Sequence, residues 1–302
     1  MIKVGIIILH YRGKDLTFKC FESLENLKKN KFFLIKILVD NNSPEPLVGF
    51  RKRFKDVIVL KNAQNLGFAE GNNVGMRYAL KNGADYVLIL NNDTTIDKNL
   101  LVYLIKQFNL INQSGILGPK IYFAPGYEYH KNRYKPNERG KVFWYAGGLI
   151  DWKNVYCSHR GVDEVDGGQY DKVEETDFVS GCAMLVKREV FEKIGLFDPS
   201  YFLYLEDVDF CQRAKKAGFK VVYVPEGKVW HYNASSSEVG GALHDYFITR
   251  NRMLFGLKYA PWRAKIALVK ESVRLLFSGR PWQKIGIKDF YFQKFGKGSW
   301  KR

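Results

Sequence analysis

The chain has 302 residues, of which 46% are hydrophobic and 26% charged, so its composition is that of a folded globular protein and excludes a largely disordered one. Its formal net charge is +17, and residues 251–302 alone hold thirteen Lys or Arg against two acidic residues. Nucleic acid, an anionic membrane or an anionic acceptor are therefore candidate partners of that segment.

The cysteines and the hydropathy of the chain indicate where the protein works. Cys20, Cys157, Cys182 and Cys211 lie too far apart for a zinc knuckle or a CxxC motif, which indicates reduced thiols. No signal-peptide pattern begins the sequence, and no apolar run approaches the ~20 residues that a membrane-spanning helix needs. We therefore expect a cytoplasmic protein.

Short apolar runs alternate with amphipathic stretches in the first third of the chain, which predicts an α/β fold. We expect an open, mainly parallel twisted sheet with helices on both faces. The predicted elements are strand Val4–Leu9, helix Asp15–Lys29, strand Ile35–Val39, strand Val57–Leu60, helix Asn72–Lys81 and strand Tyr86–Leu90. In such sheets ligands bind at the carboxyl ends of the strands, so polar turns at 40–43 and 91–93 should share one crevice.

The rest of the chain divides into three stretches of different character. Residues 122–172 are rich in Gly, Tyr and charge, and we expect an insertion or a hairpin-rich flap there. Regular structure then returns with apolar run Phe178–Val186, helix Arg188–Ile194, helix Glu206–Ala217 and strand Lys220–Val224. From 242 the composition becomes basic and aromatic, so we predict a main domain at 1–241 and a basic, largely helical extension at 242–302.

Three polar sequences in the first half fit a nucleotide ligand, and each has a simpler alternative. Asp93 at a strand end suits Mg²⁺ or Mn²⁺ bridging a diphosphate, or else a helix cap. Asp40 suits the imide of uracil or thymine, or else an Asx turn. The loop at 64–73 suits backbone contacts to a phosphate, or else simple capping by Asn72.

An acidic cluster in the second half fits general-base chemistry. Glu206, Asp207 and Asp209 begin a predicted helix among aromatic and apolar residues, so part of the cluster should be buried. A buried carboxylate with a raised pKa is a good general base, although acids at a helix N-terminus also favour the helix dipole. His231 follows an apolar run, where a structural role is common, and it gains significance only if it faces Asp93.

In this order the motifs resemble those of inverting glycosyltransferases of family two, in the rhamnosyltransferase-like branch. The resemblance covers about residues 3–255 and implies the GT-A fold. The matching sequences are VGIIILHY at 4–11, VDNNS at 39–43, NLGFAEGNN at 65–73, LNND at 90–93, FVSGCAML at 178–185, FD at 197–198, EDVD at 206–209, and His231. Residues 1–120 would then form the nucleotide-sugar-binding half of the domain, and 121–241 the acceptor and catalytic half.

The resemblance also implies residue roles. Asp93 and His231 would bind Mg²⁺ or Mn²⁺, with Asn91 replacing the first acid of the family's Asp-x-Asp motif. Asp207 would be the base, with Glu206 as the fallback. The base pocket, ribose, phosphates and sugar of the donor would meet His10, Tyr11, Asp40, Asn65, Gly67, Phe68, Asn72, Asn92, Asp93, Gly181 and Cys182.

The implied function is metal-dependent, inverting transfer of a sugar such as rhamnose from a dTDP- or UDP-sugar to an acceptor hydroxyl. The acceptor would be a glycan or lipid-linked glycan in cell-surface polysaccharide or glycolipid synthesis. One alternative is a nucleic-acid-binding protein that uses aromatic and basic side chains of the tail. The others are a donor-binding module without catalysis and a nucleotidyltransferase, for which residues 10–15 match poorly.

The predicted helix Ala264–Ser278 places apolar side chains on one face, flanked by Lys270 and Arg274. These side chains are Ile266, Val269, Val273, Leu276 and Phe277. The face could pack on the catalytic domain, form an oligomer or bind the inner face of an anionic membrane, with Trp262, Trp282 and Trp300 at the interface.

Overall fold

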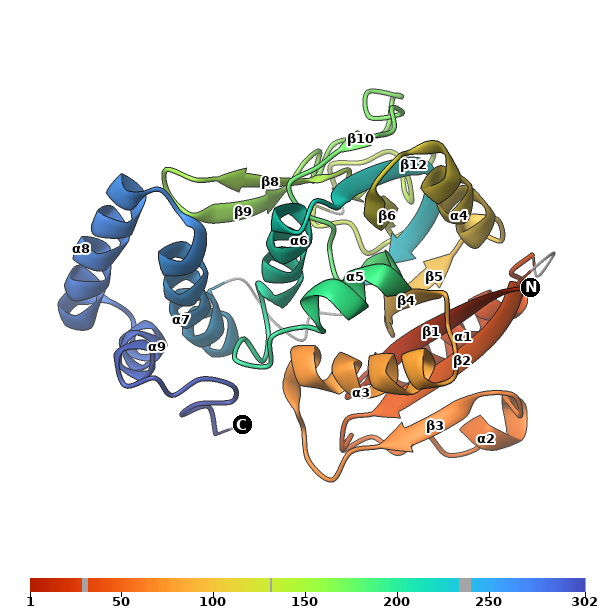
Figure 1. The fold of residues 1–302 in the computed structure, drawn as a ribbon, viewed down its shortest axis with the longest axis horizontal. Helices are drawn as coiled ribbons and strands as arrows, with labels where there is room; N and C mark the ends of the chain where they lie inside the picture. Colours follow the sequence, from red (N-terminus) through yellow and green to blue (C-terminus); the bar gives the residue numbers. More distant parts are fainter. Residues whose placement is uncertain (29–31, 131, 234–239, 302) are drawn as a thin grey trace.

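The computed structural model describes residues 1–28, 32–130, 132–233 and 240–301, and one mixed sheet flanked by helices runs through it (Figure 1). The first part of the sheet is parallel, in the order β3-β2-β1-β4. The bounds are β1 Ile2–His10, β2 Phe32–Asp40, β3 Ile58–Lys61 and β4 Tyr86–Asn91. Strands β1, β2 and β4 bury most of their apolar side chains, as the predicted runs of β-formers require.

Helices α1 Lys14–Glu25, α2 Phe50–Arg53 and α3 Gly67–Lys81 flank these strands. Close approach of α3 to the sheet depends on glycine, because a Cβ at Gly75 would lie 2.5 Å from Ile7. Helix α1 ends before the expected Lys29, which lies outside the described residues. Helix α3 begins five residues before the expected Asn72, so residues 67–73 of the Gly/Asn-rich sequence are helical and residues 64–66 form the loop before the helix.

The second part of the sheet continues from β4 through β11 Ala183–Lys187, β6 Ser114–Phe123, β12 Lys220–His231 and β10 Glu174–Glu175. Strand β11 is antiparallel to both β4 and β6, whereas β6 and β12 are parallel. The short strands β5 Thr94–Ile96 and β7 Phe143–Tyr145 pair with β12 and β6. The sheet is therefore mainly parallel, as predicted, with an antiparallel strand at its centre. Helices α4 Leu100–Leu110, α5 Arg188–Ile194 and α6 Glu206–Lys216 belong to this part.

The stretch that was expected to form a flap contains a two-stranded hairpin, β8 Gly148–Asp151 with β9 Tyr156–His159. Three further helices, α7 Ala242–Tyr259, α8 Trp262–Ser278 and α9 Pro281–Tyr291, lie together at one end of the molecule (Figure 1). Helix α7 is part of the main core, because Met253 and Phe255 are buried in it. Among the described residues no helix is both long and apolar enough to cross a membrane.

Candidate active site

The turn after β2 is organised by Asn41, a residue that sequence patterns did not single out. Its side chain is buried and contacts both Asn65 and the carbonyl of Gly67 through Nδ2, each at 3.0 Å. Its Oδ1 accepts hydrogen bonds from Asn62 and from the backbone N–H of Leu66. Asn41 thus fixes the loop between β3 and α3 against the carboxyl end of β2.

The neighbouring side chains of the predicted base pocket are also held by local bonds. Asp40 accepts a hydrogen bond from the N–H of Ser43, three residues on, at 2.9 Å, so its carboxylate stabilises the local turn, although not as the Asx turn of the simpler alternative. The ring of His10 is fully buried, with Nδ1 2.9 Å from Thr17 and Nε2 3.2 Å from the carbonyl of Glu45. His10 has no surface to offer a ligand in this structure, whereas Tyr11 is partly exposed.

The start of α3 is closed by backbone contacts rather than open to a phosphate. The N–H of Gly67 donates to Asn65, and the N–H of Phe68 donates to the carbonyl of Phe202 at 2.6 Å. Gly67 has a φ of 77° and lies so close to Phe202 that a Cβ would clash at 2.5 Å. Asn72 lies inside the helix, where it donates to the carbonyl of Phe68 rather than capping. This loop therefore offers side chains, rather than these two N–H groups, to a ligand.

Asp93 and His231 meet across the junction of β5 and β12, although 138 positions separate them. Asp93 Oδ1 lies 3.1 Å from His231 Nε2, and the two side chains are largely buried. The imidazole is packed edge-on against Trp144, with 4.5 Å between ring centroids. Its Nδ1 is buried and has no hydrogen-bond partner among the described residues. The predicted pairing of these two residues is therefore present.

The two side chains are hydrogen-bonded to each other, and their separation would also suit two ligands of one metal ion. Two ligand atoms at right angles, each ~2.1 Å from Mg²⁺, lie about 3.0 Å apart, close to the observed 3.1 Å. In the part of the chain that the structure describes, no group of three or more His, Cys, Asp or Glu could hold a metal. Asp93 and His231 would thus need phosphate oxygens and water to complete the shell, as Mg²⁺ sites commonly do.

Gly181 and Cys182 connect this pair to the acidic cluster. The carbonyl of Cys182 accepts a hydrogen bond from the N–H of Asn91 at 2.9 Å, whereas the N–H of Gly181 donates to Asp207 at 2.7 Å. Phe68 packs over Gly181, because a Cβ there would lie 3.0 Å from its ring. The thiol of Cys182 is buried, and burial raises its pKa well above the ordinary value. The segment therefore acts mainly through its backbone.

The two candidate bases have different environments. Glu206 is buried, its Oε2 has no partner among the described residues, and burial raises its pKa well above the ordinary value. Asp207 accepts hydrogen bonds from the N–H groups of Gly181 and Val208, and burial still raises its pKa. Asp207 retains a partly exposed side chain, whereas Glu206 does not. Asp207 is thus the carboxylate that an acceptor could reach.

Asp209, the third acid, is structural. Burial alone would raise its pKa, but hydrogen bonds from Lys258 and Arg213 and from Tyr259 hold the pKa below its ordinary value. Lys258 and Tyr259 lie on α7, so this carboxylate binds α6 to the C-terminal helices. The prediction that part of the acidic cluster is buried is confirmed.

The loop before α6 has a left-handed backbone at three non-glycine residues. Phe202, Tyr204 and Leu205 have φ values of 61°, 69° and 70°. Such conformations cost ~1–3 kcal/mol each and persist where surrounding contacts enforce them. Asn251 supplies such contacts, since its Nδ2 lies 2.8–2.9 Å from the carbonyl oxygens at 201, 203 and 204. Nothing in the sequence of the loop itself indicates this conformation.

Arg250, the neighbour of Asn251, is fully buried and joins the same loop to the C-terminal tail. Its guanidinium donates to the carbonyls of Ser200 and Tyr201 on one side and to that of Gly296 on the other. Helix α7 therefore positions the segment that carries Glu206 and Asp207.

Asn92 lies beside Asp93 at the carboxyl end of β4, with its Nδ2 2.7 Å from the carbonyl of Arg12 and 2.8 Å from Thr17.

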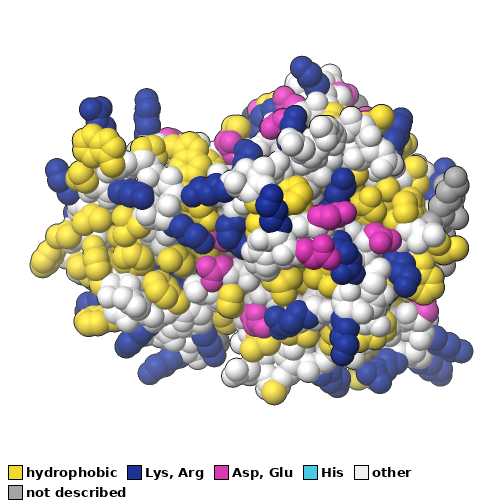
Figure 2. Space-filling view, in the orientation of Figure 1, with side chains coloured by type: hydrophobic (Ala, Val, Ile, Leu, Met, Phe, Trp, Pro, Cys, Tyr) yellow, Lys and Arg dark blue, Asp and Glu magenta, His cyan; other side chains and the backbone are white. Residues whose placement is uncertain are grey.

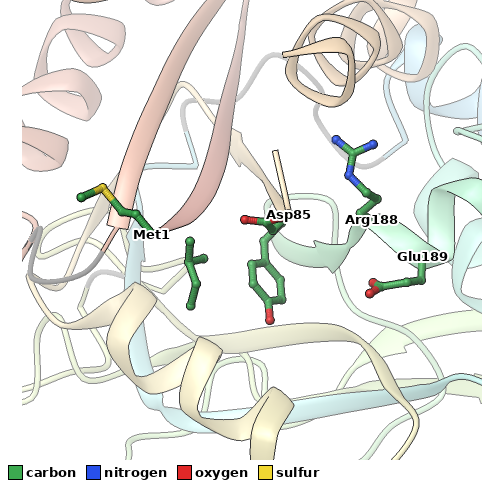
Figure 3. Close-up of a pocket in the computed structure, with 6 residues that line it drawn as sticks. Met1, Asp85, Arg188 and Glu189 are labelled. Atoms are coloured by element: carbon green, nitrogen blue, oxygen red, sulfur yellow. The ribbon is translucent and has the colours of Figure 1, made fainter. Parts of the chain in front are cut away.

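A separate hollow lies at the opposite edge of the sheet, where β1 and β4 begin, and is lined by Met1, Ile2, Asp85, Tyr86, Arg188 and Glu189 (Figure 3). In this hollow the guanidinium of Arg188 donates hydrogen bonds to the carbonyls of Ala84 and Leu80. Because ligands of open α/β sheets bind at the carboxyl ends of strands, we place the active site at the Asp93 edge.

Comparison with known proteins gives a consistent family. Residues 35–256 match the model of the family described as glycosyltransferase-like family 2. A low-salt glycan biosynthesis hexosyltransferase, Agl10 of Haloferax volcanii, is 26% identical over 222 residues, which are 72% of this chain and 63% of Agl10. The N-acetylglucosaminyl-diphospho-decaprenol L-rhamnosyltransferase of Mycobacterium tuberculosis is 28% identical over 69% of each chain. This chain thus spans less than two thirds of the length of Agl10.

Solved structures show the same fold at low identity. GalNAc-T7 with UDP, GalNAc and Mn²⁺ superposes with a TM-score of 0.68 at 15% identity, over 97% of this chain and 54% of that one. Staphylococcus aureus TarS 1–349 in complex with UDP-GlcNAc gives a TM-score of 0.58 at 14% identity, over 96% of this chain and 80% of that one. The sheet and the helices of this chain therefore follow an arrangement that occurs in proteins crystallised with nucleotide-sugars.

Proposed function

Because this chain belongs to glycosyltransferase-like family 2 and has the GT-A fold, we propose that it is a metal-dependent, inverting glycosyltransferase. It would move a sugar from a nucleotide-sugar donor to a hydroxyl group of an acceptor. The observation that carries the proposal is the linkage of two sites through residues 181–182. Asn91 beside the Asp93–His231 pair bonds to Cys182, and Asp207 bonds to Gly181.

Asp207 is the residue that would deprotonate the acceptor. Inversion requires a base that removes the hydroxyl proton on the face opposite the leaving diphosphate. A carboxylate whose pKa is raised by burial holds the proton more firmly than an exposed one, so it is a stronger base once it is ionised. The N–H of Gly181 fixes the orientation of that carboxylate.

Asp93 and His231 would hold a divalent cation, Mg²⁺ or Mn²⁺. When bound, the cation would neutralise the negative charge that develops on the diphosphate leaving group. The two side chains lie at the junction of β5 and β12, and Trp144 packs on the imidazole. This arrangement keeps both ligands in place before a donor arrives.

For the donor we propose a pyrimidine nucleotide-sugar, with dTDP-rhamnose ahead of UDP-sugars. The names of two relatives support rhamnose, namely the L-rhamnosyltransferase of Mycobacterium tuberculosis and the dTDP-rhamnosyl transferase RfbF of Shigella flexneri, 24% identical to this chain. Tyr11 and Asp40 would border the base, and Phe68, Asn92 and Gly181 would border the phosphates and sugar. The acceptor would be a glycan or lipid-linked glycan, which would bring the enzyme to the inner face of the cytoplasmic membrane.

A panel of nucleotide-sugars tests this function. A donor that binds the folded state raises the melting temperature, and about 100-fold excess over the dissociation constant corresponds to ~2.7 kcal/mol. We expect dTDP-rhamnose or a UDP-sugar to give a shift that requires Mg²⁺ or Mn²⁺, followed by turnover to a product of inverted anomeric configuration. Tight competition by GDP alone would contradict the pyrimidine donor, and a retained configuration would contradict the mechanism.

A further inference from the structure

Helix α8 carries a stripe of large apolar side chains that nothing in the described structure covers. The α8 stripe consists of Trp262, Ile266, Val269, Val273 and Phe277, with exposed fractions of 66%, 48%, 38%, 47% and 80%. At about 100° per residue these five positions fall within an arc of about 80°. The opposite face, with Ala264, Leu268 and Ser272, is the one that packs on the protein.

The stripe differs in part from the face expected from sequence. Leu276 is partly buried against the main core, whereas Trp262 joins the exposed residues. Trp300 was expected at an interface, but it is only 5% exposed. It packs with Trp282 on Tyr246, at 4.7 Å between the two indole centroids. Trp300 therefore cannot serve as the expected interfacial anchor or as a platform for nucleic-acid bases, whereas Trp282 is partly exposed.

The charge around the stripe is positive because the acidic residues of this segment face inward or are paired. Glu271 is bonded to Arg252 at 2.9 Å through both carboxylate oxygens. Asp289 is buried and accepts hydrogen bonds from Ser299. The exposed cations near the stripe and in the tail are Arg263, Lys270, Arg274, Lys288, Lys294, Lys297 and Lys301. Figure 2 shows this end of the molecule as a continuous hydrophobic patch bordered by Lys and Arg.

An apolar stripe flanked by cations fits the boundary of an anionic lipid layer. Along a helix of ~25 Å the apolar side chains would enter the layer to the depth of the headgroups. The cations would meet the lipid phosphates, each adding attraction that falls with salt. Phe292, exposed beyond α9, extends the same end of the molecule.

A second copy of this chain fits the stripe less well. Two copies that paired through α8 would face Lys270 and Arg274 of one protomer with the same cations of the other, and like charges repel. We propose that α8 lies flat on an anionic lipid surface, with the α8 stripe inserted and the flanking cations on the headgroups.

Co-sedimentation of the full chain with lipid vesicles tests this proposal. We expect binding to vesicles that contain phosphatidylglycerol and at least tenfold weaker binding to pure phosphatidylcholine. Binding to the anionic vesicles should fall several-fold between 50 and 500 mM NaCl. Equal binding to both vesicle types, or none to either, would overturn the proposal, as would a dimer whose formation depends on the stripe.

Two variants test whether vesicle binding depends on the α8 stripe or on any exposed apolar side chain. Ile266→Ser with Val273→Ser and Phe277→Ser should lower vesicle binding at least tenfold, with a circular dichroism spectrum and melting temperature close to wild type. Leu110→Ser with Phe33→Ser is the matched control, since both residues are exposed apolar side chains of other elements, and binding should be unchanged. Trp262 provides a second readout, because vesicles should shift its fluorescence to the blue and Trp262→Phe should remove that shift. Equal loss in stripe and control variants would contradict the assignment.

Discussion

The turn after β2 and the loop before α6 both present polar groups at the active-site edge, but they are held in different ways. Asn41 fixes the β2 turn with partners at most 26 positions away. The loop at 202–205 has three left-handed residues, and its main clamp is Asn251, 47–50 positions away. A locally bonded turn forms wherever its own sequence folds, whereas the strained loop depends on α7 being in place.

The Asp93–His231 pair belongs to neither region, because 138 positions separate its two residues, and its loss should give the largest effect. Asp93→Ala removes one of the two proposed protein ligands, so metal-dependent turnover should be abolished while the melting temperature stays near that of wild type. Donor turnover with and without Mn²⁺ measures this. Activity that persists in excess EDTA in the wild-type enzyme would show that no metal is needed.

Asp207, the proposed base, follows closely after the strained loop at 202–205. Asp207→Asn keeps the shape of the side chain but removes its basicity, and we expect kcat to fall by about 10²–10⁴-fold. Because burial raises the pKa of Asp207, the rise of kcat/KM with pH should lie above the ordinary aspartate range, and the variant should lose that rise. A pH series of kcat/KM on both proteins measures it, and near-wild-type turnover in the variant would reject the assignment.

Asn251 tests whether α7 positions the base. Asn251→Asp keeps the size of the side chain but removes the N–H donors to the three loop carbonyls. We expect kcat to fall about 10–100-fold with little change in donor KM, and stability to fall by ~1–3 kcal/mol because buried carbonyls lose their partners. Parallel kinetics and urea unfolding provide the measurement. A loss of stability with unchanged kcat would mean that the contact is only structural.

Substitution of Asn41 should change donor KM rather than kcat, the opposite of what we expect for Asn251. Asn41→Ala should loosen the loop at 62–67 on the proposed donor side, so donor KM should rise about tenfold with kcat changed less than threefold. The split between kcat and KM, compared with that of the Asn251 variant, is the measurement. If both variants changed the same constant, the two regions would not be separate in function.

Glu206 should give the smallest effect on activity. Burial raises its pKa above the ordinary value of 4.5, so its contribution to stability is complete below that value and is lost as pH rises through the raised pKa. Glu206→Gln removes this titration and should raise the melting temperature by a few degrees at pH 8 and less at pH 5. Melting curves at both pH values measure it, with activity within tenfold of wild type. A 10²-fold loss would instead make Glu206 the base.

The difference between local and distant contacts also explains how much of the fold and site the sequence could predict. Strand ends such as Asp93 follow from apolar runs, and helix α5 occupies the predicted residues. Helix α4 and strand β6 were not predicted. The apolar residues of α4 are too many for a clear amphipathic pattern, and β6 is interrupted by glycine and Pro119 although all ten of its residues are buried.

The contacts of Asn251 with the loop before α6 could not be predicted, because they depend on how α7 packs against that loop. Asn251 donates to backbone carbonyls, which every residue has, so no sequence pattern marks its partners. The pairing of Asp93 with His231 could be predicted only through the resemblance to family-two glycosyltransferases, which implies a shared role for the two positions. The expected interfacial role of Trp300 was wrong because an exposed and a buried tryptophan in a basic tail have the same sequence pattern.

Arg250 also sets an order in which the protein can mature during synthesis. Its partner Tyr201 precedes it by 49 positions, whereas Gly296 follows it by 46. At about 5–20 residues per second, translation from Arg250 to Gly296 would take about 2–9 seconds. During that interval the guanidinium lacks its later carbonyl partner, and the loop before α6 is incompletely held. Full activity should therefore appear only after residues 294–296 have been made and their carbonyl groups have reached Arg250.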